Sequence, residues 1–170
     1  MSSEISGLII RPLSDTDSLD DMTELLHRAY AVLADMGLKY VATYQDVDTT
    51  RRRVEKGRCF VAVIDDVIVG TIAYYGPDRT TGAPWGHGEG VAHVGQMGVG
   101  PSMQRQGIGK ELIRHVEQIA REDGAVEIAL DTAEPARHLI KWYERLGYRF
   151  VKHVDWDMTN YRSVIMSKKL

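Results

Sequence analysis

The segment "PSMQRQGIGKELIRH", residues 101–115, places two glycines, Gly107 and Gly109, where an apolar helical stripe begins. Glycine within a helix costs about 1 kcal/mol relative to alanine, so two of them in one first turn need a compensating reason. A turn that leads from a strand into a helix aims unpaired backbone N–H groups and the positive end of the helix dipole at one point, which suits phosphate. The segment therefore predicts a phosphate-binding loop whose backbone a ligand approaches closely.

The spacing of the glycines excludes two common phosphate loops. A Walker A loop needs G-x-x-x-x-G-K-[ST], but Gln104 stands at its first position and Glu111 follows Lys110. A Rossmann fingerprint that starts at Gly107 would need its third glycine at Leu112. The pattern that fits is Q/R-x-x-G-x-G/A, formed by Gln104, Gly107 and Gly109 after the strand-like "VAHVGQMGV".

This pattern resembles the acetyl-CoA loop of the GCN5-related N-acetyltransferase (GNAT) family. The later segments "VEIALDT" and "WYERLGYRF" follow in the order that this family shows, and the element order agrees from about residue 8 to 168. The resemblance implies an α/β (α+β) fold with three α-β-α layers and a mixed, twisted central sheet of about seven strands. We expect one such domain over residues 1–170, with the strands at about 91–99 and 126–132 splayed apart.

The hydrophobic pattern itself predicts the order βααβββαβαββ. The expected elements are a strand at 8–13, a helix that Gly37 closes, a short helix around 48–56, a hairpin of 58–64 and 67–75, a strand at 91–99, a helix from 108 that stops near Gly124, a strand at 125–132, a helix with Pro135 in its first turn that ends at Gly147, and strands at 149–154 and 161–169.

Acetyl-CoA is the cosubstrate that the resemblance implies. Its pantetheine would lie alongside the backbone of Met97, Gly98 and Val99, and its pyrophosphate would accept hydrogen bonds from the backbone of the loop. The loop residues expected at the pyrophosphate are Gln104, Arg105, Gln106, Gly107, Ile108, Gly109 and Lys110. The alternative is a glycine-rich helix start that binds no ligand.

Acetyl transfer to an amine needs a neutral amine, support for an oxyanion and a proton for the departing thiolate. Direct attack through a tetrahedral intermediate suffices, so no nucleophilic residue is required. The resemblance assigns the proton donor to Tyr143 of "YERLGY". Tyr143 also shares an apolar stripe with Leu139 and Ile140, so packing is the alternative role.

His93 is the expected base for the amine. Histone-acetylating relatives carry a glutamate at the matching position, and strand parity predicts that His93 and Val99 share one face. A histidine in an apolar strand can also be structural. The alternatives for the base are His87, Glu89, or a water held by Gln96 or by the pair Tyr74 and Tyr75.

One position departs from the family pattern. Many relatives have an asparagine seven residues before the tyrosine, near the pantetheine, and this chain has Ala136 there. We expect that contact to be absent or supplied by Arg137 or His138.

The acceptor is expected to be the primary amine of a small molecule or peptide, selected by the loops at 34–57 and 76–90. These loops carry Tyr40, Tyr44 and Trp85 but no readable code. The segment 76–90, with five glycines and two prolines, is either a substrate-side lid or a plain mobile loop. The triplet "RRR" at 51–53 predicts a solvated basic face, with phosphate binding as the alternative.

Composition sets the remaining expectations. With 21 basic and 24 acidic residues and a net charge of −3, nucleic-acid binding is not indicated. The single cysteine, Cys59, is expected to be a buried, inert thiol, and the six histidines form no metal motif, so no metal is assigned.

No apolar run approaches the roughly 20 residues of a membrane helix. We expect a soluble, cytoplasmic protein with no membrane contact, for which a homodimer is plausible. The rival functions are an acyl-CoA sensor without turnover and a protein-interaction domain.

Overall fold

The computed structural model describes residues 4–79 and 89–170, which form one mixed seven-stranded sheet and four α-helices. The strands are β1 (Ile9–Pro12), β2 (Arg58–Ile64), β3 (Val67–Tyr75), β4 (Val91–Val99), β5 (Glu127–Ala133), β6 (Arg149–Asp155) and β7 (Arg162–Lys169), and the helices are α1 (Leu19–Asp35), α2 (Val47–Glu55), α3 (Ile108–Glu122) and α4 (Arg137–Arg145), with short 3-10 turns η1 (Val41–Thr43), η2 (Pro77–Arg79) and η3 (Pro101–Met103). This order confirms the predicted βααβββαβαββ.

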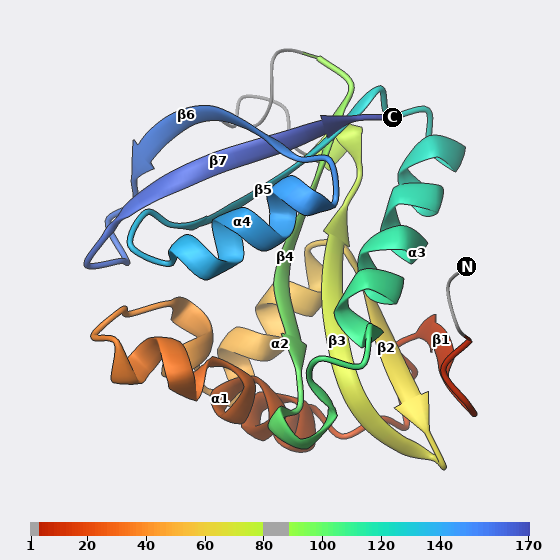
Figure 1. Cartoon of the computed structure of the whole chain (residues 1–170). Helices are drawn as coiled ribbons and strands as arrows, with labels where there is room; N and C mark the ends of the chain where they lie inside the picture. The colour runs from red at the N-terminus through yellow and green to blue at the C-terminus, as the bar shows by residue number, and fades with distance from the viewer. Residues whose placement is uncertain (1–3, 80–88) are drawn as a thin grey trace.

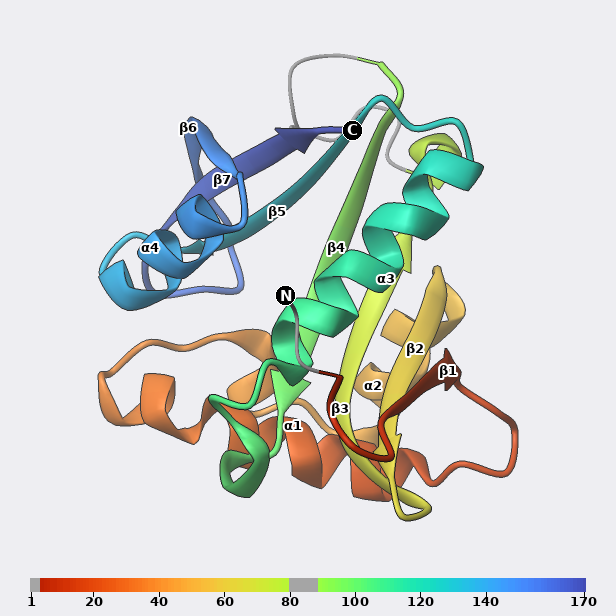
Figure 2. The same ribbon diagram turned by 45° about the vertical axis from the view of Figure 1, so that its right-hand side comes forward.

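The sheet has the strand order β1-β2-β3-β4-β5-β7-β6. Helices α1 and α2 cover one face and α3 and α4 the other, which gives the expected three layers (Figure 2). Met22 of α1 packs against the β2 residues Cys59 and Val61, whereas Leu112 and Val116 of α3 pack against the opposite side of the sheet. Burial raises the pKa of the Cys59 thiol to about 11, as expected for an inert cysteine.

The helix ends follow the capping residues in the sequence. Ser18 accepts a hydrogen bond from the Asp21 backbone N–H at 3.1 Å and begins α1, and Gly37 follows its end in the left-handed conformation. The helix α4 begins at Arg137, with Ala136 as its N-cap. Pro135 therefore precedes the helix instead of lying in its first turn.

Strands β4 and β5 run parallel but pair only where they begin, from Val91 with Glu127 to His93 with Ala129. Beyond these residues the two strands diverge, as Figure 1 shows, and the expected splay is confirmed. On the far side of the divergence β5 pairs with β7 over seven residue pairs. The sheet thus consists of a β1–β4 half and a β5–β7–β6 half.

A buried carboxylate joins the two halves. Glu117 of α3 accepts hydrogen bonds from Lys168 of β7 at 3.1 Å and from the Tyr148 hydroxyl at 3.0 Å. Glu117 is 4% exposed, and both of its carboxylate oxygens have partners. This ion pair links α3, which packs on the first half, to the second half.

Within residues 4–79 and 89–170, every helix falls short of the length and apolar character that a bilayer crossing requires.

Candidate functional site

The backbone of Met97, Gly98 and Val99 lies on the part of β4 that has left β5. The Met97 carbonyl accepts a hydrogen bond from the Tyr30 hydroxyl of α1 at 2.7 Å. A Cβ on Gly98 would lie 3.1 Å from the Ala29 Cβ, so this glycine lets α1 cross the strand closely. The three residues predicted to border the pantetheine therefore form an unpaired strand edge braced by α1.

The loop between β4 and α3 is held to the end of β4. The Gln104 side chain donates to the Val99 carbonyl at 3.0 Å, and the Gly100 N–H donates to the Val69 carbonyl at 2.8 Å. Arg105 and Gly107 both adopt the left-handed conformation, at φ 65° and 88°. For Arg105 this backbone costs roughly 1–2 kcal/mol. Alternating left-handed residues turn successive N–H groups toward one point, as in anion-binding nests.

The N-terminus of α3 lacks a side-chain cap. Its N-cap is Gly107, whereas Ser18 and Asp46 cap α1 and α2 with their side chains. The first N–H groups of any α-helix, here those of Ile108, Gly109 and Lys110, have no partner inside the helix. The predicted loop residues thus present unpartnered donors at the positive end of a 15-residue helix.

Gly107 and Gly109 are required for different reasons. At Gly107 an added Cβ would meet only Ile5, at an ordinary 3.8 Å, so the left-handed backbone is what requires glycine. At Gly109 an added Cβ would lie 3.3 Å from the Trp142 ring of α4. Gly109 therefore permits close packing of α4 against the start of α3.

Tyr143 of α4 lies in the core beside the divergence, with Tyr148 in edge contact at 6.0 Å between ring centroids. Burial raises the pKa of its phenol, and Tyr30, Tyr40 and Asp131 act in the same direction. Within the described part of the chain its hydroxyl makes no hydrogen bond. The hydroxyl thus stays protonated at neutral pH and retains its donor.

The predicted parity of His93 and Val99 is wrong. Gln96 adopts a left-handed backbone at φ 51°, and the β3–β4 register shifts there, so three steps of β4 from Gly95 to Gly98 face two of β3. This bulge reverses the alternation. The Val99 side chain lies toward Gly109 of α3, whereas His93 stacks on Tyr75 on the α2 face.

The surroundings of His93 do not favour a base. Burial, together with the Arg53 charge, lowers the pKa of His93 to about 3. The imidazole is therefore neutral at pH 7 but a weak proton acceptor. The base role remains a prediction that this environment opposes.

The other residues predicted as the base, or as holders of a catalytic water, lie at separate places in the structure. Tyr74 donates to Asp123 below α3, whereas Tyr75 donates to the Arg53 carbonyl on the opposite face, so the two cannot hold one water. Glu89 is exposed. His87, Trp85 and most of the predicted loop 76–90 lie outside the described residues.

A polar network on the α2 face was missed by sequence reasoning. Arg53 donates to the Gln45 side-chain oxygen at 2.7 Å, and the Gln45 amide donates to Thr50 at 2.7 Å and to Gln96 at 3.0 Å. The expectation of a solvated "RRR" face holds for Arg51 and Arg52, which are exposed, but not for Arg53, which is half-buried.

Asp131 of β5 is the second residue that sequence reasoning missed. Its carboxylate accepts a hydrogen bond from the Trp156 indole at 2.8 Å. Burial raises the pKa of Asp131, against the opposing effects of Trp156 and of the Arg53 charge. A carboxylate with a raised pKa beside a strand divergence is a stronger proton acceptor than an ordinary exposed aspartate.

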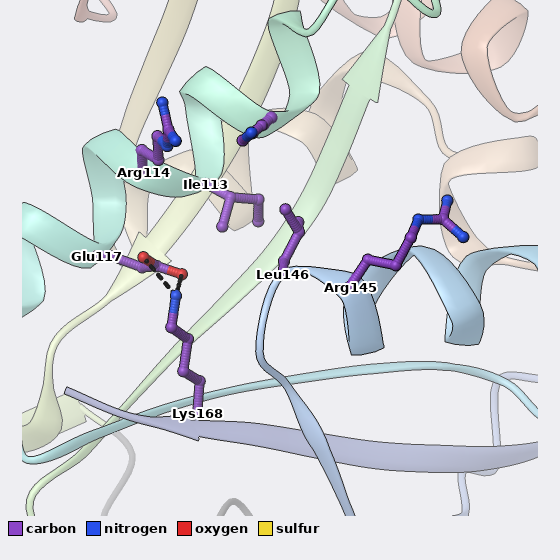
Figure 3. A pocket seen from close by; sticks show the side chains of 7 residues that line it. Ile113, Arg114, Glu117, Arg145, Leu146 and Lys168 are labelled. Carbon is purple, nitrogen blue, oxygen red and sulfur yellow. Dashed lines mark hydrogen bonds and ion pairs between the residues drawn. The ribbon is translucent and has the colours of Figure 1, made fainter. Parts of the chain in front are cut away.

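A pocket of about 270 Å³ lies between α3 and the end of α4, with β7 at its base (Figure 3). It is lined by Lys110, Ile113, Arg114, Glu117, Arg145, Leu146 and Lys168. Lys168 points at Glu117 and is neutralised by it, and Arg114 pairs with Glu111 at 3.1 Å. Among the described residues, Lys110 and Arg145 are the lining cations that form no ion pair. Among residues 4–79 and 89–170, no three His, Cys, Asp or Glu side chains form a group that could hold a metal.

Ala136 is fully buried against Leu33, Leu38 and Ala133, so the position where many relatives carry asparagine belongs to the core here. Arg137 and His138 are exposed.

Comparison with known proteins agrees with this geometry. The model of the acetyltransferase (GNAT) family matches residues 19–148. The S-(2-succino)cysteine N-acetyltransferase of Bacillus subtilis is 31% identical over 157 residues, which cover 89% of this chain and 90% of that protein.

Solved structures share the fold. An acetyltransferase from Streptococcus agalactiae matches with a TM-score of 0.73 and 19% identity, over 98% of this chain and 100% of that one. A GNAT family acetyltransferase from Elizabethkingia anophelis with acetyl-CoA bound matches with a TM-score of 0.68 and 14% identity, over the same shares of the two chains. The diverging parallel strands, the uncapped helix after a glycine loop, the family model and the 31% identical relative together lead to one conclusion: this chain belongs to the GNAT family and is an acyl-CoA-dependent N-acetyltransferase.

Proposed function

We propose that this enzyme transfers the acetyl group of acetyl-CoA to the primary amine of a small molecule by direct attack. The observation that carries the proposal is the divergence of β4 and β5, flanked by the uncapped start of α3 and by the Tyr143 side chain. An unpaired strand edge and unpartnered helix N–H groups match an amide-bearing pantetheine arm that ends in a pyrophosphate.

In this proposal the chain binds acetyl-CoA mainly through its backbone. Met97, Gly98 and Val99 offer a strand edge to the pantetheine, where the Met97 and Val99 carbonyls already accept from Tyr30 and Gln104. Residues 104–110 offer N–H groups to the pyrophosphate. The left-handed Arg105 and Gly107 orient that loop before any ligand arrives. Bound acetyl-CoA supplies a thioester carbonyl that an amine can attack directly.

Tyr143 acts on the leaving group. Because the pKa of this phenol is raised by burial, full proton transfer to a thiolate of pKa about 8.5 would be uphill. The hydroxyl therefore donates a hydrogen bond to the charge that develops on sulfur, and it gives its proton to the thiolate only as it receives another.

The B. subtilis relative names the first acceptor to test, S-(2-succino)cysteine. The experiment measures thiol release from acetyl-CoA with a panel of amines: S-(2-succino)cysteine, S-methylcysteine, spermidine, tryptamine and a peptide with a free N-terminus. Thiol release with at least one small amine supports the proposal. Binding of acetyl-CoA without thiol release for any amine contradicts it.

Replacing Tyr143 by Phe is expected to lower kcat by about 10²- to 10⁴-fold, because a positioned proton donor typically contributes that much. The KM for acetyl-CoA and the melting temperature should change little, since the ring and its packing remain. Steady-state kinetics check this. A kcat within about twofold of wild type, with chemistry shown to be rate-limiting, would make Tyr143 a packing residue.

A further inference from the structure

Two opposite charges face one another across the strand divergence, on the sheet face that carries α1 and α2. His93 pairs with Ala129, so the parallel register continued by two residues would place Gly95 opposite Asp131. A Cβ on Gly95 would lie 3.9 Å from the Arg53 guanidinium, which places that guanidinium beside Gly95. Arg53 and Asp131 therefore flank the point where the strands separate.

Arg53 is held in place but is not neutralised. Its bond to the Gln45 oxygen fixes the Gln45 amide, which in turn donates to Thr50 and Gln96. Arg53 makes no ion pair with any residue of 4–79 and 89–170. A guanidinium has five N–H donors in a planar fork, so several remain for a ligand.

A second donor beside Arg53 also lacks a partner. The Gln96 amide nitrogen is buried, and no hydrogen-bond acceptor reaches it from the described residues. Because Gln96 accepts from Gln45 through its oxygen, the nitrogen is the atom left over. A buried unpaired donor costs about 1–3 kcal/mol, and a ligand oxygen would remove that cost.

Asp131 supplies the negative charge that lies across the strand divergence from Arg53. Its charge and that of Arg53 act on one another, since Arg53 opposes the rise in the pKa of Asp131, yet the two form no ion pair. The other titratable groups that interact with Asp131 are Tyr30 from α1, Tyr40 before η1, Tyr143 from α4 and Tyr161 before β7. Burial raises the pKa of each of these phenols, so all four stay neutral near pH 7 and add no charge around Asp131.

We propose that the acceptor is an amino acid, whose carboxylate binds the Arg53 guanidinium with help from the Gln96 amide, and whose amine donates to Asp131. This inference rests on the proposed function and specifies its substrate class. A zwitterion with its charges a few bonds apart fits between two fixed opposite charges that do not meet. Polyamines lack the carboxylate and would leave Arg53 unpaired beside a second cation.

The same geometry assigns the protons. The ammonium of the acceptor gives one proton to Asp131, and the amine nitrogen then bonds to the thioester carbonyl carbon as the carbon–sulfur bond breaks. The nitrogen loses its second proton as the amide forms, and the Tyr143 hydroxyl relays that proton to the thiolate. The products are then the amide, the free thiol and a protonated Asp131, which returns its proton to solvent.

The first experiment compares an amino acid with its α-amide as acceptor, using S-(2-succino)cysteine or S-methylcysteine, whichever the wild-type enzyme acetylates faster. The amide has the less basic amine, so amine chemistry alone favours it, and a preference for the acid must come from binding. We expect Arg53→Gln to lower kcat/KM for the acid by about 10- to 100-fold, the usual range for a hydrogen bond to a charged group. The value for the amide and the KM for acetyl-CoA should stay within about twofold.

Arg52→Gln is the matched control, because Arg52 is the exposed neighbour on the same helix and its side chain bonds to Thr49 alone among residues 4–79 and 89–170. It should leave both acceptors unchanged, and Arg53→Lys should restore part of the preference. The inference is overturned if the wild-type enzyme uses the acid and the amide equally well. It is also overturned if the enzyme acetylates spermidine or tryptamine but no amino acid. Either result leaves the proposed function intact. A raised KM for acetyl-CoA in Arg53→Gln also overturns it, by assigning Arg53 to phosphate.

The second experiment tests Asp131 through the pH profile of kcat/KM. Asp131→Asn keeps an oxygen for the Trp156 indole, and acetyl-CoA affinity should stay unchanged. Activity should fall most below the pKa of the acceptor amine and rise with pH in step with the neutral amine. An Asp131→Asn enzyme with the wild-type pH profile, or the same change of profile in His93→Gln instead, contradicts the assignment.

Discussion

A single backbone angle decides what Gly107 contributes. Its φ of 88° belongs to the left-handed region, which glycine enters without a steric penalty. Space is not the constraint there, since the nearest atom to an added Cβ would be Ile5 Cδ1 at 3.8 Å. The requirement is therefore conformational in this structure, and any demand for space would come from the ligand.

We expect Gly107→Ala to lower the free energy of unfolding by about 1 kcal/mol, through the cost of a left-handed alanine, and also to weaken acetyl-CoA binding. Gly124→Ala is the matched control, since Gly124 is left-handed at φ 79°, has open space around it and lies at the far end of α3. Urea unfolding and calorimetric titration separate the two effects. If both variants lose stability equally and acetyl-CoA affinity is unchanged in both, Gly107 is only a helix-start residue.

Arg53 and Asp131 are the two site residues that the sequence did not predict. Arg53 follows the buried Thr50 by three positions, which puts both on one helix face, but a run of three arginines concealed that spacing. Asp131 follows the apolar residues Ile128, Ala129 and Leu130 in the segment "EIALDTA", and this was the signal available. Side-chain partners such as Trp156 are 25 positions away in sequence, so no local pattern predicts them.

At the level of elements, periodicity predicted nearly every helix and strand, because each buries one face and alternates accordingly. The strand β4 has the predicted bounds, but its alternation breaks where the bulge at Gln96 adds one residue and turns His93 away from Val99. A left-handed glutamine has no signature in the sequence, since the residue types favoured there are Gly, Asn and Asp. The regular alternation of side chains between the two faces of a sheet therefore predicts their positions only up to the first bulge of a strand.

The ion pair between Glu117 of α3 and Lys168 of β7 can be tested by removing one of its partners. Lys168→Met leaves the Glu117 carboxylate buried with Tyr148 alone, and breaking a buried pair in this way costs about 3 kcal/mol. The control is Arg114→Met, which removes the exposed pair with Glu111 on the same helix and should cost no more than about 0.5 kcal/mol. Urea denaturation measures both. Equal losses would show that the Glu117 tie adds no more than a surface pair.

For the molecule as a whole, the half-buried charge at Asp131 opposes folding at neutral pH. Its pKa is raised in the fold above the unfolded value of about 3.9, so the neutral form is the one the fold favours. Its contribution to stability is complete below pH 3.9 and is lost as pH rises through the folded pKa. Asp131→Asn should therefore be more stable than wild type at pH 8.

Below the unfolded pKa of Asp131 this advantage should vanish, because both chains then carry a neutral group at position 131. Urea unfolding of the two proteins without ligand, at pH 8 and at the lowest pH where both stay folded, checks the sign. A variant that is less stable than wild type at pH 8 would mean that the ionised Asp131 stabilises the fold, and the raised pKa would be wrong.

The position of β7 between β5 and β6 has a consequence for the order in which the chain can assemble. Strands β1 to β4 are neighbours in sequence as well as in space, so the first half can pair while synthesis continues. The edge of β5, by contrast, stays bare until residues 162–169 have emerged from the ribosome, since its seven-pair partner is made after β6. During that interval the nascent protein carries an open strand edge, which is a template for pairing with other chains. Translation thus finishes the β5–β7–β6 half of the sheet last.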